Sequence, residues 1–199
     1  MYNMIATRPD LSFAVGTLSR FLSNPNSAHV KAAKRVLRYL KGTRSYRLSY
    51  SPQKKVQISA AYCDSDYGNC PDTRRSISGY CLYVAGGPVM WRSRLQRTTA
   101  TSSVEAEYMA LSDVVKEVLW FRSFLSELDY PQTNATQIFL DNTGAEALAK
   151  NPVHHDRTKH IDIRYHFIRE HIKRGTVKLT HVDTKMNVSD MMNKPLAAP

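Results

Sequence analysis

The chain has 199 residues, of which 42% are hydrophobic and 23% charged, and its formal net charge is +11. This composition excludes a disordered chain and predicts a soluble globular protein with one ordinary domain plus an appendage. No stretch reaches the ~20 apolar residues of a membrane span, no signal-peptide core is present, and the three cysteines form no CxxC pair, so we expect an intracellular protein without a membrane partner.

The positive charge is concentrated at the beginning of the chain. Residues 1–55 contain 11 Lys/Arg and one acidic residue, a net charge of +10, which leaves +1 for the other 144 residues. A nearly neutral domain that carries a basic arm indicates a polyanionic partner for the arm.

The first strong periodic pattern predicts a helix over residues 27–42. Apolar residues recur at helical spacing on one face, and Gly42 follows as a stop signal. The opposite face carries five cations with no acid among them: Lys31, Lys34, Arg35, Arg38 and Lys41. A solvated face is the ordinary explanation, but without acids the cations cannot form i,i+4 pairs. We therefore favour nucleic-acid binding through phosphate contacts.

A proline and polar residues near SYSPQKK predict a boundary between a small helical segment, 1–52, and a domain, 53–199. Apolar patterns in the domain predict a strand over 56–64, two strands joined at Gly86-Gly87, a long helix over about 103–128, a strand in TQIFLDN, helices over 143–150 and about 161–173, a strand over 176–182 and a short helix over about 188–193. This order predicts an α/β fold: a mixed five-stranded sheet with an antiparallel leading meander, parallel later strands and flanking helices.

Acidic residues at element ends are candidate metal ligands. Asp64 and Asp66 lie two apart at the end of the first predicted strand, so strand parity leaves open which one is a ligand. On the long helix Glu105 forms a capping box with Ser102 and lies on the more polar side, whereas Glu107 heads the apolar stripe. Because a carboxylate in a buried stripe is costly unless a cation or hydrogen bonds meet it, Glu107 is the better candidate.

Two further aspartates complete a possible set. Asp141 ends the strand TQIFLDN, at the edge of the sheet where α/β proteins gather functional groups. Asp190 lies in the first turn of the last predicted helix, where an acid is ordinarily a cap or a partner of the helix dipole. Together, acids at a strand end, a helix head, a second strand end and a late helix can hold Mg²⁺, which prefers oxygen ligands.

Several blocks are similar to one family. ATRPDLSFAVGTLSRFLSNP and HVKAAKRVLRYLKGT resemble the thumb or connection segment of a reverse transcriptase, and YCDSDYGNCPDTRRSISGY, WRSRLQRTTATSSVEAEYMAL, IFLDNTGAEALAKNP, RTKHIDIRYHFIRE and NVSDMMNKPL resemble ribonuclease H blocks. Nearly the whole chain thus resembles the C-terminal part of the Pol polyprotein of copia-type LTR retrotransposons.

The resemblance implies a ribonuclease H-like fold and hydrolysis of the RNA strand of RNA/DNA hybrids with two Mg²⁺, or Mn²⁺, as cofactors. It carries the catalytic and metal-binding roles to Asp64, Glu107, Asp141 and Asp190, with Asp66 as a supporting residue. The implied partner is the upstream polymerase domain of the same polyprotein, and the implied location is the cytoplasm, in a virus-like particle, or the nucleus.

The sequence departs from the family pattern near the metal-site blocks: Tyr67 stands where Trp is usual, Ser189 where Ala is usual and Asn193 where Thr is usual. His181 is the nearest match to the mobile histidine of cellular ribonucleases H, but it alternates with apolar residues, a pattern that also fits a packed side chain. Five histidines between His154 and His171 are best explained as loop and surface residues, because their spacing matches no familiar zinc site.

Two other functions remain open from the sequence. The chain could be a non-catalytic or co-opted nucleic-acid-binding remnant of a retroelement, since it contains no polymerase aspartate pair. It could also be another nuclease of the same fold, such as an integrase or exonuclease, although these lack a block like SSVEAEYMAL.

Overall fold

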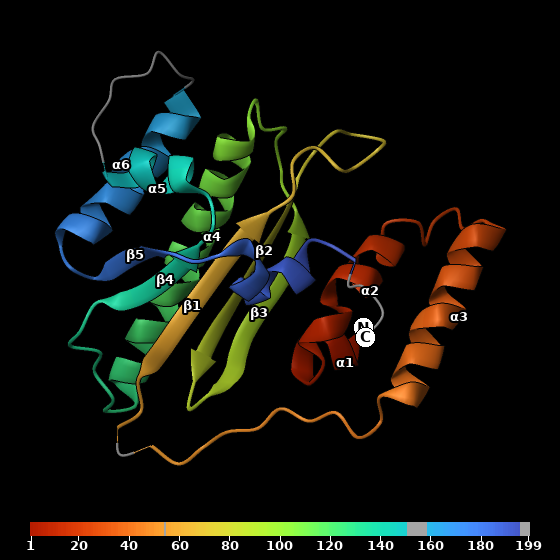
Figure 1. Cartoon of the computed structure of the whole chain (residues 1–199), viewed down its shortest axis with the longest axis horizontal. Helices are drawn as coiled ribbons and strands as arrows, with labels where there is room; N and C mark the ends of the chain where they lie inside the picture. Colours follow the sequence, from red (N-terminus) through yellow and green to blue (C-terminus); the bar gives the residue numbers. More distant parts are fainter. Residues whose placement is uncertain (54, 151–158, 196–199) are drawn as a thin grey trace.

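The computed structural model describes residues 1–53, 55–150 and 159–195. Its centre is a five-stranded sheet in the order β3-β2-β1-β4-β5 (Figure 1). The strands are β1 (Ile58–Ser65), β2 (Ile77–Val84), β3 (Gly87–Leu95), β4 (Thr136–Leu140) and β5 (Val177–His181). Strands β1, β2 and β3 pair antiparallel, and β4 pairs parallel with both β1 and β5. The predicted mixed sheet is therefore confirmed.

Three helices follow the meander: α4 (Ser103–Glu127), α5 (Thr143–Lys150) and α6 (Lys159–Lys173). Ser102 caps the start of α4, and its Oγ accepts a hydrogen bond from the N–H of Glu105 (3.1 Å). Its apolar stripe, which includes Leu111 and Val118, is fully buried against the sheet. The main core lies here, and its buried members all fall between Ile58 and Leu179. This burial is the chief source of stability for the sheet.

The other face of the sheet meets the end of the chain. A 3-10 helix η3 (Val188–Met192), preceded by η2 (Thr184–Met186), lies in front of β1 and β2 (Figure 1). A Cβ added at Gly79 would stand only 2.5 Å from Cβ of Met192. The glycine in β2 thus lets η3 approach the sheet closely.

The N-terminal segment packs beside β3. It forms α1 (Tyr2–Ala6), η1 (Pro9–Leu11) and α2 (Ser12–Ser19). Nε1 of Trp91 donates to the carbonyl of Met4 (2.6 Å), and the N–H of Ser51 donates to the carbonyl of Ala85 (2.7 Å). Residues near the start and near the end of the segment therefore bond to the β2–β3 hairpin.

The predicted basic helix is α3 (Ser27–Gly42), which packs on α2 and lies outside the sheet (Figure 1). Tyr39 near its end donates to Asp10 Oδ2 (2.8 Å), which also pairs with Arg8 (2.7 Å). No residue of α3 is buried, and the apolar side chains of Val30 and Leu37 are 47% and 65% exposed. The helix is confirmed, but its apolar face does not enter the core.

The hairpin turn between β2 and β3 lies one residue earlier than predicted. Ala85 and Gly86 occupy it, both with positive φ (55° and 79°), and Gly87 already pairs with Val84. Gly87 serves a different purpose, because a Cβ there would meet the ring of Tyr50 at 2.6 Å. The pair of glycines is thus divided between turn geometry and close packing.

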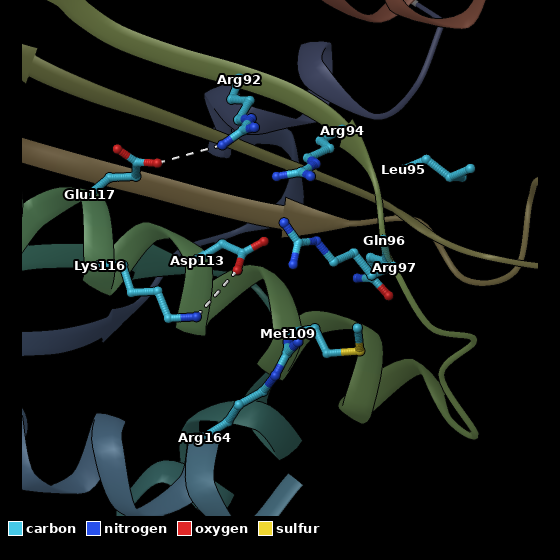
Figure 2. Close-up of a pocket in the computed structure, with 10 residues that line it drawn as sticks. All are labelled: Arg92, Arg94, Leu95, Gln96, Arg97, Met109, Asp113, Lys116, Glu117 and Arg164. Atoms are coloured by element: carbon cyan, nitrogen blue, oxygen red, sulfur yellow. Dashed lines mark ion pairs between the residues drawn. The ribbon is translucent and has the colours of Figure 1, made fainter. Parts of the chain in front are cut away.

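A pocket of about 250 Å³ opens between β3 and α4, on the flank of the long helix (Figure 2). The side chains that line it come from β3, the loop after it, α4 and α6.

Within the described ranges, no helix is long and apolar enough to span a membrane. The three cysteines are all free and buried.

Candidate active site

Three carboxylates from separate elements meet at one edge of the sheet. Asp64 lies near the end of β1, Glu107 in the second turn of α4, and Asp141 directly after β4. One carboxylate oxygen from each lies within 4.8 Å of the others. Asp64 and Glu107 are 1% and 7% exposed, and Asp141 is half-buried. Parallel pairing of β1 and β4 brings both aspartates to the same edge, and α4 brings its head over them.

The electrostatics of this cluster favour a cation. Burial, followed by the negative charges of Asp64 and Asp141, raises the pKa of Glu107 well above its ordinary value. Glu107 Oε2 is buried and accepts no hydrogen bond from any described residue. A hard divalent cation would supply the missing partner, and an all-carboxylate donor set suits Mg²⁺ or Mn²⁺. The residues present therefore fit a metal of this class.

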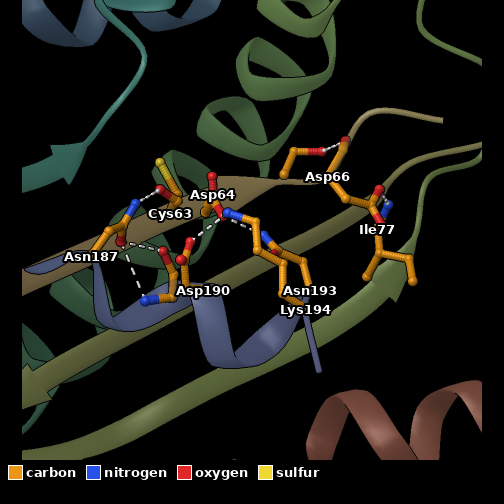
Figure 3. Close-up of polar contacts among 10 residues, drawn as sticks. Cys63, Asp64, Asp66, Ile77, Asn187, Asp190, Asn193 and Lys194 are labelled. Carbon is orange, nitrogen blue, oxygen red and sulfur yellow. Dashed lines mark hydrogen bonds and ion pairs between the residues drawn. The ribbon is translucent and has the colours of Figure 1, made fainter. Parts of the chain in front are cut away.

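Asp190 lies outside the group of three but interacts with Asp64, and a lysine bridges the two. Lys194, two residues after the end of η3, has its Nζ between two carboxylates, 3.0 Å from Asp64 Oδ2 and 2.8 Å from Asp190 Oδ1 (Figure 3). Partial burial, followed by the hydrogen bond with Asp64, raises the pKa of Asp190. Partial burial opposes the charge of Lys194, but its hydrogen bonds to both aspartates outweigh this and raise its pKa. The ammonium group thus holds the two carboxylates together.

Two of the family departures lie inside this site. Asn193 donates from Nδ2 to Asp64 Oδ2 (2.8 Å), and it is 1% exposed. Ser189 is fully buried and bonds to Asn187, whose Nδ2 donates to the carbonyl of Cys63 (3.1 Å; Figure 3). The unusual residues therefore help to fasten η3 to the end of β1.

Asp66 is buried but lies outside the group of three carboxylates. Its Oδ1 accepts the N–H of Ile77 (2.6 Å), and its own N–H donates to the carbonyl of Ile77 (3.2 Å). Asp66 thus joins the end of β1 to the start of β2, which agrees with the supporting role expected for it.

The environment of Glu105 differs from the prediction. Its carboxylate accepts the N–H of Thr101 (2.7 Å) and the hydroxyl of the same residue, not the N–H of Ser102. It is 4% exposed, and Met109 and Ser112 on the same side are buried as well. The predicted polar side of α4 is wrong here, because Ala100 of the loop before the helix packs with Met109 on this side.

The histidines take no part in a metal cluster within the described residues. His181 ends β5, and its Nε2 lies 3.1 Å from the carbonyl oxygen of Asp141. His154 and His155 fall outside the described residues.

Sequence reasoning missed Lys194 and the contact made by Asn193. Lys194 follows Asp190 by four residues, a spacing that could have indicated the pair. Nothing local could have indicated Asp64, which lies 130 positions away.

The five cations of α3 do not join the carboxylates. Lys31, Lys34, Arg35, Arg38 and Lys41 are all exposed on a helix that lies beyond α2. Their predicted contact with nucleic acid would therefore take place away from the carboxylate cluster.

No family model matches the sequence, but individual relatives do. The chain is 41% identical over 194 residues to the retrovirus-related Pol polyprotein from transposon TNT 1-94 of Nicotiana tabacum, covering 98% of this chain and 14% of that protein. It is 39% identical over 191 residues to the corresponding polyprotein from transposon RE1 of Arabidopsis thaliana, covering 96% of this chain and 13% of that protein. The chain thus spans about one seventh of the length of these relatives.

A shorter relative is covered more completely. The chain is 48% identical over 120 residues to the secreted RxLR effector protein 161 of Plasmopara viticola, which covers 60% of this chain and 84% of that protein.

Among solved structures, LC11-RNase H1, isolated from compost, has a TM-score of 0.51 at 14% identity, covering 71% of this chain and 94% of that one. The likeness shows a ribonuclease H-like fold. The polyprotein matches, which extend over nearly the whole chain, identify it as a relative of the retrovirus-related Pol polyproteins of copia-type transposons.

Proposed function

We propose that this chain hydrolyses the RNA strand of RNA/DNA hybrids as the ribonuclease H part of a retrotransposon polyprotein, downstream of a reverse transcriptase. The observation that carries the proposal is the meeting of Asp64, Glu107 and Asp141, from three elements, at a buried sheet edge with an unpartnered carboxylate oxygen. The Pol relatives and the ribonuclease H-like fold favour this reaction over others that a carboxylate cluster could perform.

In this proposal Asp64, Glu107, Asp141 and Asp190 would hold two Mg²⁺ or Mn²⁺ ions. Bound ions of this kind activate an attacking water and stabilise the leaving oxygen of a phosphodiester. The half-buried Asp141 and the 31% exposed side chain of Asp190 form the open side of the site, where a phosphate can approach. The more buried Asp64 and Glu107 form its floor and keep their positions through the packing of β1 and α4.

Two kinds of contact would bind the substrate, one that selects RNA and one that only adds affinity. Contacts to ribose 2′-hydroxyls across the minor groove would distinguish RNA from DNA. The exposed cations of α3 would hold the backbone without reading its sequence, so binding should weaken steeply with salt.

Cleavage of a labelled RNA/DNA hybrid in Mg²⁺ tests the proposal, with Asp141→Asn as the paired variant. We expect the wild-type chain to cut the RNA strand and the variant to lose cleavage while keeping most of its hybrid affinity, because the amide removes a charge that holds metal. An Asp141→Asn protein that cuts at a rate near wild type would overturn the site assignment.

The same assay separates the other functions. Hybrid binding without cleavage by the wild-type chain would favour a non-catalytic remnant. Cleavage of single- or double-stranded DNA in preference to the hybrid would favour another nuclease of this fold.

A further inference from the structure

The pocket between β3 and α4 gathers more positive charge than its acids can balance. Five cations line it (Arg92, Arg94, Arg97, Lys116 and Arg164) with two acids, Asp113 and Glu117, for a net charge of +3. They come from β3, the loop after it, α4 and α6, and Figure 2 shows the side chains of Arg94 and Arg97 pointing into the space between β3 and α4. We call this set of side chains the basic pocket.

The acids of the basic pocket neutralise it only weakly. Arg92 lies 3.7 Å from Glu117, and Lys116 lies 3.9 Å from Asp113, and in both of these long pairs the cation is exposed and the acid partly buried. Ion pairs this long near the surface stabilise a protein little, so they do not commit the two cations to the acids. The side chains of the other three arginines form no hydrogen bond or ion pair with any residue in the described ranges: Arg94, Arg97 and Arg164. Their donors are therefore available to an anion.

The chemistry of the lining favours phosphate. Arginine presents a planar fork of N–H donors that matches phosphate oxygens in pairs, and four of the five cations are arginines. The volume of about 250 Å³ is several times the ~30 Å³ share of one liquid water. A phosphate group with its remaining hydration fits this space.

The basic pocket adjoins the carboxylate cluster. Its buried Gln96 donates from Nε2 to the Ser65 hydroxyl (3.1 Å) and to the carbonyl of Ala106 (2.9 Å). Ser65 directly follows Asp64, and Ala106 directly precedes Glu107. Gln96 thus links the lining of the basic pocket to the chain neighbours of Asp64 and Glu107.

We infer that the basic pocket binds the phosphodiester backbone of the nucleic acid at a point away from the cleaved bond. The inference rests on the proposed function for the identity of the ligand, since a hybrid is the polyanion that the proposed activity would bring to this chain. It adds a second contact to that made by α3, on a different part of the molecule.

The test is the affinity of the full chain for a labelled RNA/DNA hybrid, measured by fluorescence anisotropy in EDTA over a range of KCl concentrations. We expect Arg94→Gln/Arg97→Gln to raise Kd about tenfold and to lower the salt slope by about two, since each lost phosphate contact removes about 0.9 from it. The matched control, Lys173→Gln/Lys178→Gln, removes the same charge from exposed sites outside the basic pocket and should change Kd less than about twofold.

An unchanged Kd and slope in Arg94→Gln/Arg97→Gln would overturn the inference. If that double variant does not fold, judged by its thermal transition, Arg164→Gln carries the test, with a slope lower by about one expected. If the two arginines govern binding of a polyglutamate peptide instead of the hybrid, the basic pocket takes an acidic protein segment and the inference is wrong.

Cleavage in Mg²⁺ distinguishes this result from the proposed function. If the wild-type chain does not cut the hybrid but binds it through Arg94 and Arg97, the proposed activity is wrong and the inference about the basic pocket holds. If the chain cuts the hybrid and its affinity does not depend on either arginine, the proposed activity holds and the inference is wrong.

Discussion

At the scale of single residues, the carboxylate cluster destabilises the metal-free fold, but it offers ligands to a cation. Glu107 is nearly buried, lies beside two other carboxylates and has an unpartnered Oε2. Removing its charge should therefore stabilise the metal-free fold. We expect Glu107→Gln to raise the free energy of unfolding in EDTA at pH 7.5 by about 1–3 kcal/mol while abolishing hybrid cleavage.

The effect of Glu107→Gln should depend on pH. The pKa of Glu107 is raised on folding, so between its ordinary value and its folded value the native state binds more protons than the unfolded state. Wild-type stability in EDTA then falls as pH rises through that window, whereas Gln cannot ionise. The advantage of the variant should vanish below about pH 4, in the range where unfolded Glu is protonated. Thermal unfolding at several pH values measures this, and a constant difference would contradict it.

Lys194 acts as a counter-ion for Asp64 and Asp190. Lys194→Met leaves both carboxylates without it, so we expect the metal-free protein to lose about 1–2 kcal/mol. This is less than for a fully buried pair, because the lysine side chain is 40% exposed. Since a divalent ion would compete with the ammonium group, the rise in Tm on adding Mg²⁺ should be larger in the variant than in wild type.

Lys185→Met is the control for Lys194→Met, since Lys185 lies on the neighbouring η2 and its side chain pairs with no described residue. Equal Mg²⁺-induced rises in Tm for Lys194→Met and wild type would show that the ammonium group does not compete with the ion.

Residue-level prediction from the sequence is possible only where a local pattern carries the information. Glu107 was separable from Glu105 because it heads an apolar stripe. Asp64 was separable from Asp66 only through family resemblance, because both fall on one side of an ideal strand. Contacts such as Asn193 with Asp64 join positions 129 apart and follow from tertiary packing alone.

At the scale of elements, the position of η3 depends on a glycine, because Gly79 has no side chain to hold η3 away from β2. A Cβ at Gly79 would stand 2.5 Å from Cβ of Met192 and 3.0 Å from the carbonyl oxygen of Ser189. Alanine ordinarily stabilises a strand relative to glycine, so a loss of stability in Gly79→Ala would point to the steric clash with η3. We expect Gly79→Ala to destabilise the fold by about 1–3 kcal/mol and to reduce cleavage, because η3 would move with Asp190. Thermal unfolding and the hybrid assay measure the two effects.

Gly42→Ala is the control for Gly79→Ala, because a Cβ there meets no atom within 4 Å. It should be neutral or stabilising by up to about 1 kcal/mol. If Gly79→Ala matched it in stability and cleavage, close approach at Gly79 would not position η3.

The elements themselves were largely predictable, because period and end signals are local. Helix α4 was expected over about 103–128 and spans Ser103–Glu127, and β5 lies within the expected 176–182. The exposure of α3 was not predictable, since an apolar stripe predicts a helix but does not show which element packs against it.

At the scale of the whole molecule, the main core lies in one part of the chain, and most of the net positive charge lies in the part before it. Every buried member of the main core lies between Ile58 and Leu179, inside the predicted 53–199 domain. The 1–52 segment adds contacts at the rim, such as Arg20 Nη1 to Cys70 Sγ (3.5 Å) and Trp91 to Met4. Cooperative folding should therefore belong to the domain, and the segment should contribute stability and charge.

A 53–199 fragment tests that division. It keeps the core and the carboxylates, so we expect one cooperative unfolding transition and retained cleavage in Mg²⁺. Loss of the rim contacts should lower Tm by about 5–10 °C, which corresponds to roughly 3 kcal/mol for a domain of this size. The fragment also loses nine Lys/Arg and one Asp, and with them α3, so the salt slope of hybrid binding should become shallower. A fragment without a cooperative transition would place residues 1–52 inside the folding unit, and an unchanged salt slope would show that α3 does not hold the backbone.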